Sequence, residues 1–353
     1  MENVQLYKVE SLKKEKKQRL VGLDLLKVLS MIFIIIHHVS KHGGFFENST
    51  GFAKVFLSII NALFLPSVNV FVITSAYLII KKGKTSLKNL FKLYFQIVFY
   101  SVLTYFLACL LNYKSFVFVE FIKNFFVISH LLFWFVKAYL IMYIVSPLLL
   151  KIVNGLNKKE YIITLFAIGI ILLYSSLNKN FIMFQLDNGF NAIWFCVLFI
   201  ITGYQVRFGF NFKKIWFLLV FLLCTILLFL EIYLSKFSIA YSNVIVLIQT
   251  ISIFNVLYDV NIKNKFCCEV IKYLATCTLG IYLLHDGAYI QPYLYSNILQ
   301  TQNFYSTPLA LLYFMMFCLI IFAAGVIVES LRKSLLKLIK FTYERIKRKK
   351  SEN

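Results

Sequence analysis

Long apolar runs separated by short polar segments dominate this sequence. An α-helix needs about 20 mostly apolar residues to cross the hydrocarbon core of a bilayer. Ten runs have that character, near residues 22–40, 55–80, 89–111, 131–153, 160–177, 190–206, 214–234, 240–258, 271–290 and 307–330. The pattern predicts an all-α polytopic membrane protein of about ten transmembrane helices with no separate soluble domain. An even number of spans places both termini on the same side.

Composition supports a membrane protein and excludes soluble classes. Of the 353 residues, 60% are hydrophobic and only 15% are charged, whereas soluble domains carry about 25% charged residues. The first apolar run begins at Val21, directly after a basic stretch, and has no small-residue cleavage site. It therefore reads as a retained first helix and not as a signal peptide. The seven cysteines follow neither a disulfide framework nor a zinc spacing, so we expect no metal.

The net charge of +22 is explained by topology. Of the 37 Lys and Arg residues, 30 fall in segments that ten spans place on one side of the membrane. The positive-inside rule makes that side the cytoplasm, where the basic residues also attract anionic lipid. This distribution argues against nucleic acid as a partner. We expect a basic N-terminal segment (1–21), a ten-helix membrane domain (22–330) and a basic amphipathic tail (331–353) along the inner surface.

Two adjacent histidines end the first apolar run, in "IIIHHVS" at residues 34–40. On a helix of about 100° per residue, His38 lies within about 20° of Lys27 and about 40° of Asp24. His37 points about 80° away from Lys27. Ionisable groups in a span usually face a protein interior or a wet cavity, so one interpretation is a functional stripe. The alternative is that Asp24 and Lys27 snorkel to one interface and His38 lies at the other.

The first helix resembles that of the integral-membrane acyltransferase family 3. That family has Gly-Leu-Asp-x-Leu-Arg (or Lys), then ten residues, then His. "GLDLLKVLSMIFIIIHH" matches with Gly22, Leu23, Asp24, Leu26, Lys27 and His38. The helical phase and the family spacing thus select the same histidine.

Later segments resemble further motifs of the family, in the same order. "SVNVFVITSAYLI" is similar to the second span and aligns Ser75 with the motif serine, with Asn69 and Ala76 replacing Pro and Gly. The basic start of the third span resembles Arg-x-x-Arg, with Lys92 at the second arginine and Lys88 beside the first.

Two more motifs complete the resemblance. "HLLFWFVKAYLIMYIVSPLL" is similar to the fourth span around Trp134, although His130 stands four residues before the tryptophan and not two. "TLGIYLLH" resembles "SFGIYLIH" and aligns Gly280, Tyr282 and His285.

The resemblance implies an enzyme of the bacterial cell membrane that moves an acyl group, commonly acetyl, from cytoplasmic acyl-CoA. The acceptor is commonly a hydroxyl of an extracytoplasmic or lipid-linked glycan. His38 suits a general base because imidazole titrates near neutrality, and a covalent acyl-histidine remains open. Asp24 is the other catalytic candidate. It lies roughly 21 Å along the helix from His38, so we expect it to pair with Lys27 or another cation.

Donor binding would use lysines on the inner side: Lys27, Lys88 and Lys92. The rise from Lys27 to His38 is roughly 16 Å, on the order of a pantetheine arm. A phosphate held at Lys27 would therefore present its thioester near His38. Lysine would bind that phosphate as a point charge.

Six further residues are candidate substrate contacts because they place polar or aromatic groups within spans: His130, Trp134, Lys137, His285, Tyr282 and Ser75. His285 would line the acceptor site or lie at the interface, and Trp134 would stack on a sugar or join an interfacial belt. Ser75 would donate a hydrogen bond or allow close helix packing. His42 stands beside "GG", and we expect no role for it in an exposed loop.

Two other functions compete with this one. A transporter or exporter of glycans or small solutes would favour broken helices and pseudo-symmetric halves, which the apolar pattern does not indicate. An acyltransferase acting on an amine or another non-sugar acceptor would share the same residues. The acceptor and the identity of the acyl group stay open.

Overall fold

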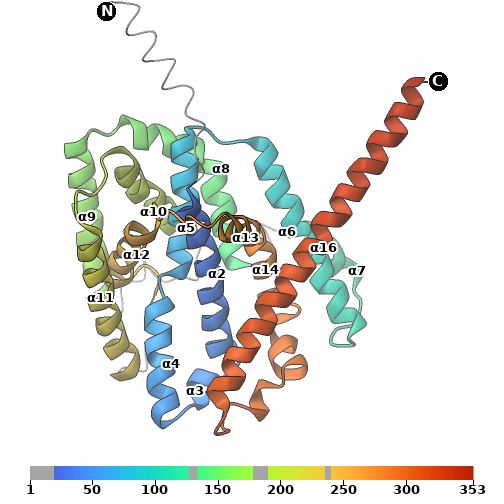
Figure 1. Cartoon of the computed structure of the whole chain (residues 1–353), viewed down its shortest axis with the longest axis horizontal. Helices are drawn as coiled ribbons and strands as arrows, with labels where there is room; N and C mark the ends of the chain where they lie inside the picture. The colour runs from blue at the N-terminus through green and yellow to red at the C-terminus, as the bar shows by residue number, and fades with distance from the viewer. Residues whose placement is uncertain (1–19, 127–132, 178–189, 235–239, 353) are drawn as a thin grey trace, which may run out of the picture.

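The computed structural model describes residues 20–126, 133–177, 190–234 and 240–352, and in these ranges it contains helices and no strands (Figure 1). The all-α prediction is therefore confirmed for the described chain. Six of the described helices are long and apolar enough to cross a membrane, or seven if one bent pair is counted as a span. The protein is a membrane protein, and a total of ten spans remains a prediction.

Helix α2 (Val21–His42) occupies the middle of the molecule. It packs against α4 (Gly51–Phe64), α5 (Ser67–Lys82), α13 (Lys265–Ala275) and α16 (Ala310–Glu352). Its buried face is mostly apolar, which explains why it forms the centre of the core. A Cβ atom at Gly22 would overlap the backbone carbonyl of Leu257 at the end of α12 (Val244–Leu257), so the first motif residue must be glycine.

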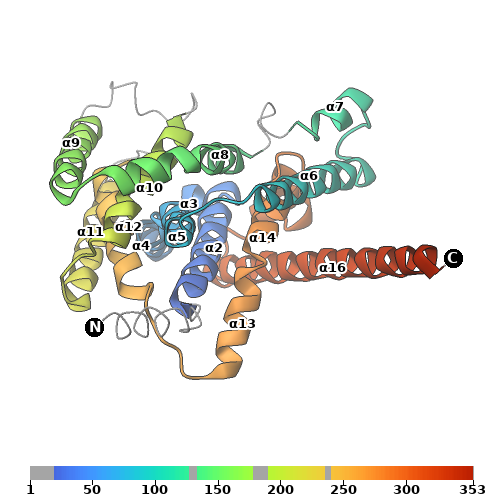
Figure 2. The same cartoon turned by 90° about the horizontal axis from the view of Figure 1, so that it is seen from above.

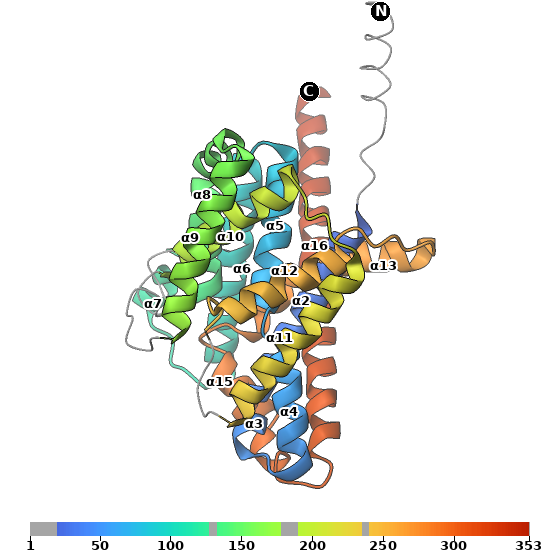
Figure 3. The ribbon, with the colours of Figure 1, turned by 90° about the vertical axis from the view of Figure 1, so that its left-hand side faces the viewer.

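The other long helices surround α2 and α5. Helices α8 (Trp134–Gly155), α9 (Lys158–Leu177) and α10 (Phe190–Arg207) form one side of the molecule, and α16 lies on the other (Figures 2 and 3). Helices α6 (Leu87–Leu110) and α11 (Lys214–Leu234) stand at the periphery. Helix α11 exposes much of its apolar surface. An apolar helix with so much surface exposed is typical of a span that faces lipid.

Two predicted spans are not continuous helices. The 55–80 run is divided into α4 and α5 at Leu65 and Pro66. Proline has no backbone N–H to continue the helical bonding of α4, and it tolerates the start of a helix. The 271–290 run begins inside α13 and contains α14 (Thr278–His285), and these two helices meet at an angle of 43°.

The break between α13 and α14 lies at Thr276 and Cys277. Their N–H groups bond to the carbonyls of Tyr273 and Leu274, three residues back. These bonds tighten the last turn of α13 and end it. Between α14 and α16 the chain forms only short elements: α15 (Gln291–Tyr293), the π-helix η2 (Leu294–Ile298) and the 3₁₀-helix η3 (Thr301–Asn303).

Helix α16 contains both the last apolar run and the basic tail. It continues from Ala310 to Glu352 as one helix of 43 residues, and its C-terminal part projects beyond the bundle (Figure 1). The tail is thus helical without a break from the span. Its position along a membrane surface remains a prediction, and nearly all of the basic segment 1–21 lies outside the described residues.

Candidate active site

His38 meets residues from the other end of the sequence. Its Nδ1 lies 3.0 Å from Nε2 of His285, at the end of α14, and 3.4 Å from Oδ1 of Asp286. Both imidazoles are buried, with 8% of His38 and 3% of His285 exposed. The break between α13 and α14 sets the direction of α14 and so brings His285 against α2. The result is a compact polar cluster of His38, His285 and Asp286 inside an apolar core.

The hydrogen bonds determine where the protons of this cluster lie. Nδ1 of His285 is 2.7 Å from the carbonyl oxygen of Ile281, which can only accept, so this nitrogen carries a proton. In a neutral imidazole the other nitrogen, Nε2, then accepts. It accepts from Nδ1 of His38. Nε2 of a neutral His38 is therefore unprotonated and has the lone pair that a base requires.

Tyr282 and His42 border the same cluster. The ring centroid of Tyr282 is 6.5 Å from that of His38, and its buried hydroxyl lies beside Asp286. His42 is the last residue of α2, and its ring meets that of His38 edge-on at 5.1 Å. The expectation that His42 stands apart in a loop was wrong, because α2 extends one turn beyond His38.

Three of these side chains have the composition of a cation site. His38, His42 and Asp286 each bring one ligand atom within 4.8 Å of the others, and two imidazoles with a carboxylate suit a divalent transition metal. In the described structure, however, Nδ1 of His38 faces both Asp286 and His285. A cation bound through Nδ1 of His38 would therefore replace the hydrogen bond to His285.

His37 lies on a different face of α2. Its Nδ1 is 3.1 Å from Oδ1 of Asn61 on α4, and its ring centroid is 6.3 Å from that of His38. The amide of Asn61 donates to Ser40 Oγ and to the carbonyl of Leu57. His37 is therefore held by α4, while His38 is held by α14.

A cavity of about 180 Å³ lies at the Lys27 end of α2. Lys27, Ser75, Tyr139 and Thr278 supply its polar lining. Ser75 is buried and lies beside the hydroxyl of Tyr139. We call this space the Lys27 cavity.

A second, narrower cavity of about 10 Å³ lies beside His38, lined also by Met31, Trp134 and Tyr282. Phe71, Phe135 and Leu279 line both this cavity and the Lys27 cavity. These three apolar side chains therefore stand between the two spaces. The Lys27 cavity and His38 are thus neighbours along α2, separated by a narrow apolar constriction.

A family model described as an acyltransferase domain, that of acyltransferase family 3, matches residues 20–329. The chain belongs to acyltransferase family 3. None of the curated proteins searched and none of the solved structures searched matches it. The match extends from the start of α2 to Glu329 in α16, so it includes all helices that form the His38 cluster and the Lys27 cavity.

The other predicted site residues of this family 3 acyltransferase are spread more widely. Asp24 is buried near the start of α2, whereas Lys88 and Lys92 are exposed on the first turns of α6. Lys137 is half-buried on α8. His130 lies outside the described residues. The structure thus brings His285, Tyr282 and Trp134 to His38, and Ser75 to Lys27, but does not gather the lysines of α6 at the same cavity.

Asn69, which replaces a proline of the family motif, joins three elements. Its Oδ1 accepts a hydrogen bond from the indole of Trp194 on α10, and its Nδ2 donates to the carbonyl of Tyr241 before α12. The ring of Tyr241 stacks on Trp134, with centroids 5.6 Å apart. The substitution thus anchors the wall of the site that contains Trp134.

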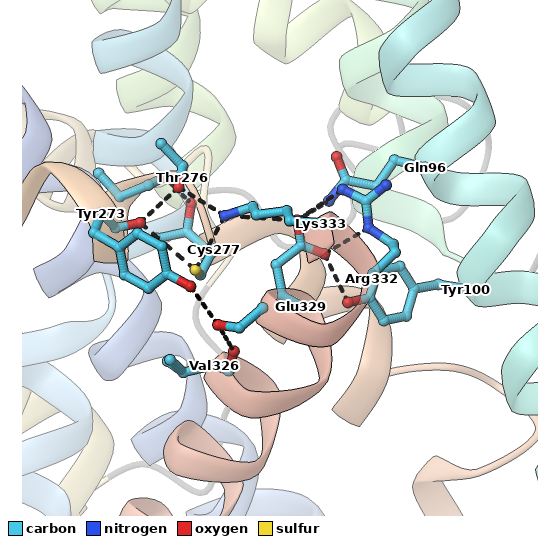
Figure 4. A network of polar contacts seen from close by, with 12 residues as sticks. Gln96, Tyr100, Tyr273, Thr276, Cys277, Val326, Glu329, Arg332 and Lys333 are labelled. Carbon is cyan, nitrogen blue, oxygen red and sulfur yellow. Dashed lines mark hydrogen bonds and ion pairs between the residues drawn. The ribbon is translucent and has the colours of Figure 1, made fainter. Parts of the chain in front are cut away.

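A buried polar network that the sequence did not predict surrounds Glu329 on α16 (Figure 4). Glu329 is fully buried and accepts hydrogen bonds from Tyr100 (2.8 Å), Gln96 (3.3 Å) and both Nε and Nη2 of Arg332 (2.8 and 2.7 Å). Lys333 lies 3.8 Å from the same carboxylate. A charge buried this deeply must be paired, and here the pairing ties α16 to α6.

The same network reaches the break between α13 and α14. Nζ of Lys333 donates to Oγ1 of Thr276 (2.7 Å) and to Sγ of Cys277 (3.2 Å) (Figure 4). A Cβ atom at Gly280 would lie 2.5 Å from Oε2 of Glu329, which explains the glycine of the family motif. The network therefore fixes the position of α14, the helix that presents His285 to His38.

Proposed function

We propose that this protein transfers an acyl group, acetyl in the first instance, from acyl-CoA to a hydroxyl of a surface glycan or a lipid-linked sugar. His38 is the general base of this reaction. The observation that carries the proposal is the unprotonated Nε2 of a buried histidine beside a narrow cavity, with Nδ1 held by His285. A sugar hydroxyl is a poor nucleophile until a base accepts its proton, and imidazole is the side chain best suited to that at neutral pH.

The transfer follows from the hydrogen bonds of His38. Nε2 takes the proton of the acceptor hydroxyl while the oxygen forms a bond to the thioester carbon. The bond from that carbon to sulfur then breaks, and the proton passes from His38 to the CoA thiolate. While His38 carries two protons, the carboxylate of Asp286 at 3.4 Å and Nε2 of His285 stabilise its charge.

The donor is proposed to enter from the Lys27 end. Phosphates of CoA would meet the Lys27 ammonium as a point charge, with Lys88 and Lys92 contributing at the exposed start of α6. The pantetheine arm would occupy the Lys27 cavity and pass between Phe71 and Phe135 toward His38. The rise of roughly 16 Å between Lys27 and His38 matches that role.

The orientation of the protein in the membrane follows from the positions of its basic residues. Helix α2 begins at the end of the molecule where α5 ends with Lys81 and Lys82 and where α9 begins with Lys158 and Lys159 (Figure 1). By the positive-inside rule this end faces the cytoplasm. We therefore propose a bacterial plasma-membrane enzyme with both termini cytoplasmic, its basic surface against anionic lipid and its His38 end toward the outside.

Broken helices do not favour a transporter here. The break between α13 and α14 borders the Lys27 cavity, which Ala275 and Thr278 help to line, so it has a place in donor binding. Membership of the family favours acyl transfer. An amine acceptor would require the same base and the same donor cavity, and acceptor competition in the assay below would reveal it.

Replacing Lys27 with alanine should raise the KM for acyl-CoA by about 10-fold or more, because a hydrogen bond between charged groups contributes about 1.5–3 kcal/mol. Lys27→Arg should retain most donor affinity, since a guanidinium also binds phosphate. The measurement is acceptor-dependent release of the CoA thiol by purified protein, with acetyl-CoA as donor and isolated glycan as acceptor.

Two results of this assay would count against the account. Equal loss in Lys27→Ala and Lys27→Arg would mean that Lys27 maintains the packing of α2 and does not bind the donor. No acceptor-dependent release of CoA by the native protein, with any sugar or amine tested, would overturn the proposed acyl transfer itself.

A further inference from the structure

We infer that the acceptor carries a second hydroxyl next to the one that is acylated, and that His37 binds this second hydroxyl. The inference rests on the proposed function, because it assigns the neighbour of the reacting group. It makes His37 a specificity-determining residue and names the acceptor class as a vicinal diol, such as a pyranose ring with adjacent free hydroxyls.

The protonation of His37 follows from its contact with Asn61. The Nδ2 group of Asn61 donates to the carbonyl oxygen of Leu57 at 2.9 Å, which fixes the orientation of the amide. Oδ1 of Asn61 must then accept, and it accepts from Nδ1–H of His37 at 3.1 Å. Nε2 of a neutral His37 therefore has a lone pair that can accept a hydrogen bond. Within the described part of the chain, no hydrogen bond to this nitrogen is present.

His37 and His38 line one cavity together. It measures about 10 Å³, which is room for one hydroxyl-sized group, and Ser67 and Tyr241 also contribute to its lining. His38, Ile34 and Val68 also line the narrow cavity that borders the constriction. His38 thus stands between a space that leads to the Lys27 cavity and a space that it shares with His37.

The spacing of the two rings suits neighbouring hydroxyls. Their centroids are 6.3 Å apart, which is roughly two hydrogen-bond lengths. Two hydroxyls on adjacent carbons of one sugar ring can therefore each donate to one imidazole. Nε2 of His38 takes its proton away during transfer, whereas Nε2 of His37 only accepts a hydrogen bond and orients the ring.

Asn61 orients the ring of His37. Its Nδ2 donates hydrogen bonds to the carbonyl of Leu57 and to Ser40 Oγ, and its Oδ1 accepts one from Nδ1 of His37. All of these residues except His37 are buried. A histidine that only packed α2 against α4 would not need to line a cavity together with His38.

The test compares acceptors that differ in one hydroxyl. Methyl hexopyranosides and their monodeoxy analogues are supplied as probes with acetyl-CoA, and CoA release and the position of the ester are measured. We expect the native protein to prefer the diol by about 10-fold in kcat/KM, the value of one hydrogen bond of about 1.5 kcal/mol. In His37→Phe the KM for the diol should rise to that of the deoxy analogue, while kcat is largely retained.

His37→Gln serves as the conservative variant, because its amide oxygen still accepts a hydrogen bond, and it should restore part of the preference. Equal use of diol and deoxy probes by the native protein would overturn the inference, as would a His37→Phe variant that still prefers the diol. If folded His37→Gln lost kcat with every probe, His37 would take part in the chemical step. That result would also contradict the inference. Failure of the proposed function looks different, because then the native protein releases no CoA with any probe.

Discussion

Replacing His38 with alanine will lower the rate of acyl transfer by about 10²–10⁴, the usual loss when a general base is removed. His38 lines a cavity, Nε2 is the unprotonated nitrogen of its ring, and His285 holds the ring by Nδ1. The measurement is acceptor-dependent CoA release by purified protein, compared at equal amounts of folded enzyme. Ester content of the surface glycan in cells that express each variant provides an independent reading.

His37→Ala is the matched comparison at saturating acceptor, since the two histidines are adjacent on one helix and His37 is proposed to affect the KM for the acceptor and not kcat. It should retain turnover at saturating acceptor, because His37 is bonded to Asn61 and has no part in the His285 hydrogen bond. If His37→Ala were inactive and His38→Ala active, the assignment of the base would be wrong. Activity in both variants would move the base elsewhere, with His285 as the next residue to test.

Replacing Glu329 with alanine should destabilise the protein severely. Breaking a buried ion pair by removing one partner costs about 3–5 kcal/mol, because a charge is left unpaired. Here Arg332 would lose two hydrogen bonds and Tyr100 a third. The freed α16 would also release α14, and with it His285. Thermal unfolding of the detergent-purified protein measures the loss, together with the yield of monodisperse protein.

An exposed ion pair on the same helix provides the control. Lys340 and Glu344 lie 3.7 Å apart with most of their side-chain surface exposed or half-exposed, and such pairs contribute little to stability. Glu344→Ala should therefore unfold at nearly the same temperature as the native protein. A Glu329→Ala variant that is as stable as Glu344→Ala would show that the network in Figure 4 does not hold α14 in place.

Local geometry made part of the candidate site predictable. The phase of one helix selects His38 over His37 and places it on the same face as Lys27, because the repeat of 3.6 residues is a property of the helix alone. Only the structure explains why Gly22 and Gly280 are glycines: each lies too close to a neighbouring element to allow a Cβ atom.

Contacts between segments that are far apart in the chain could not be predicted from the sequence. His38 and His285 are separated by 247 positions, and no local pattern indicates which nitrogen of one faces the other. The break at Thr276 and Cys277 was missed because neither residue is proline or glycine, whereas Pro66 offered a signal for the break between α4 and α5. Glu329 also left a signal, since an acidic residue at the end of an apolar run requires a partner.

The central claim is that an acyl group passes from a donor at the Lys27 end to an acceptor at the His38 end of one membrane domain. Sealed proteoliposomes that contain only this protein test it most directly, with labelled acetyl-CoA outside and an impermeant glycan acceptor trapped inside. The account predicts labelled ester on the trapped glycan from the molecules whose Lys27 end faces outward, and none with His38→Ala. Labelled ester that forms only when donor and acceptor share one compartment would contradict it.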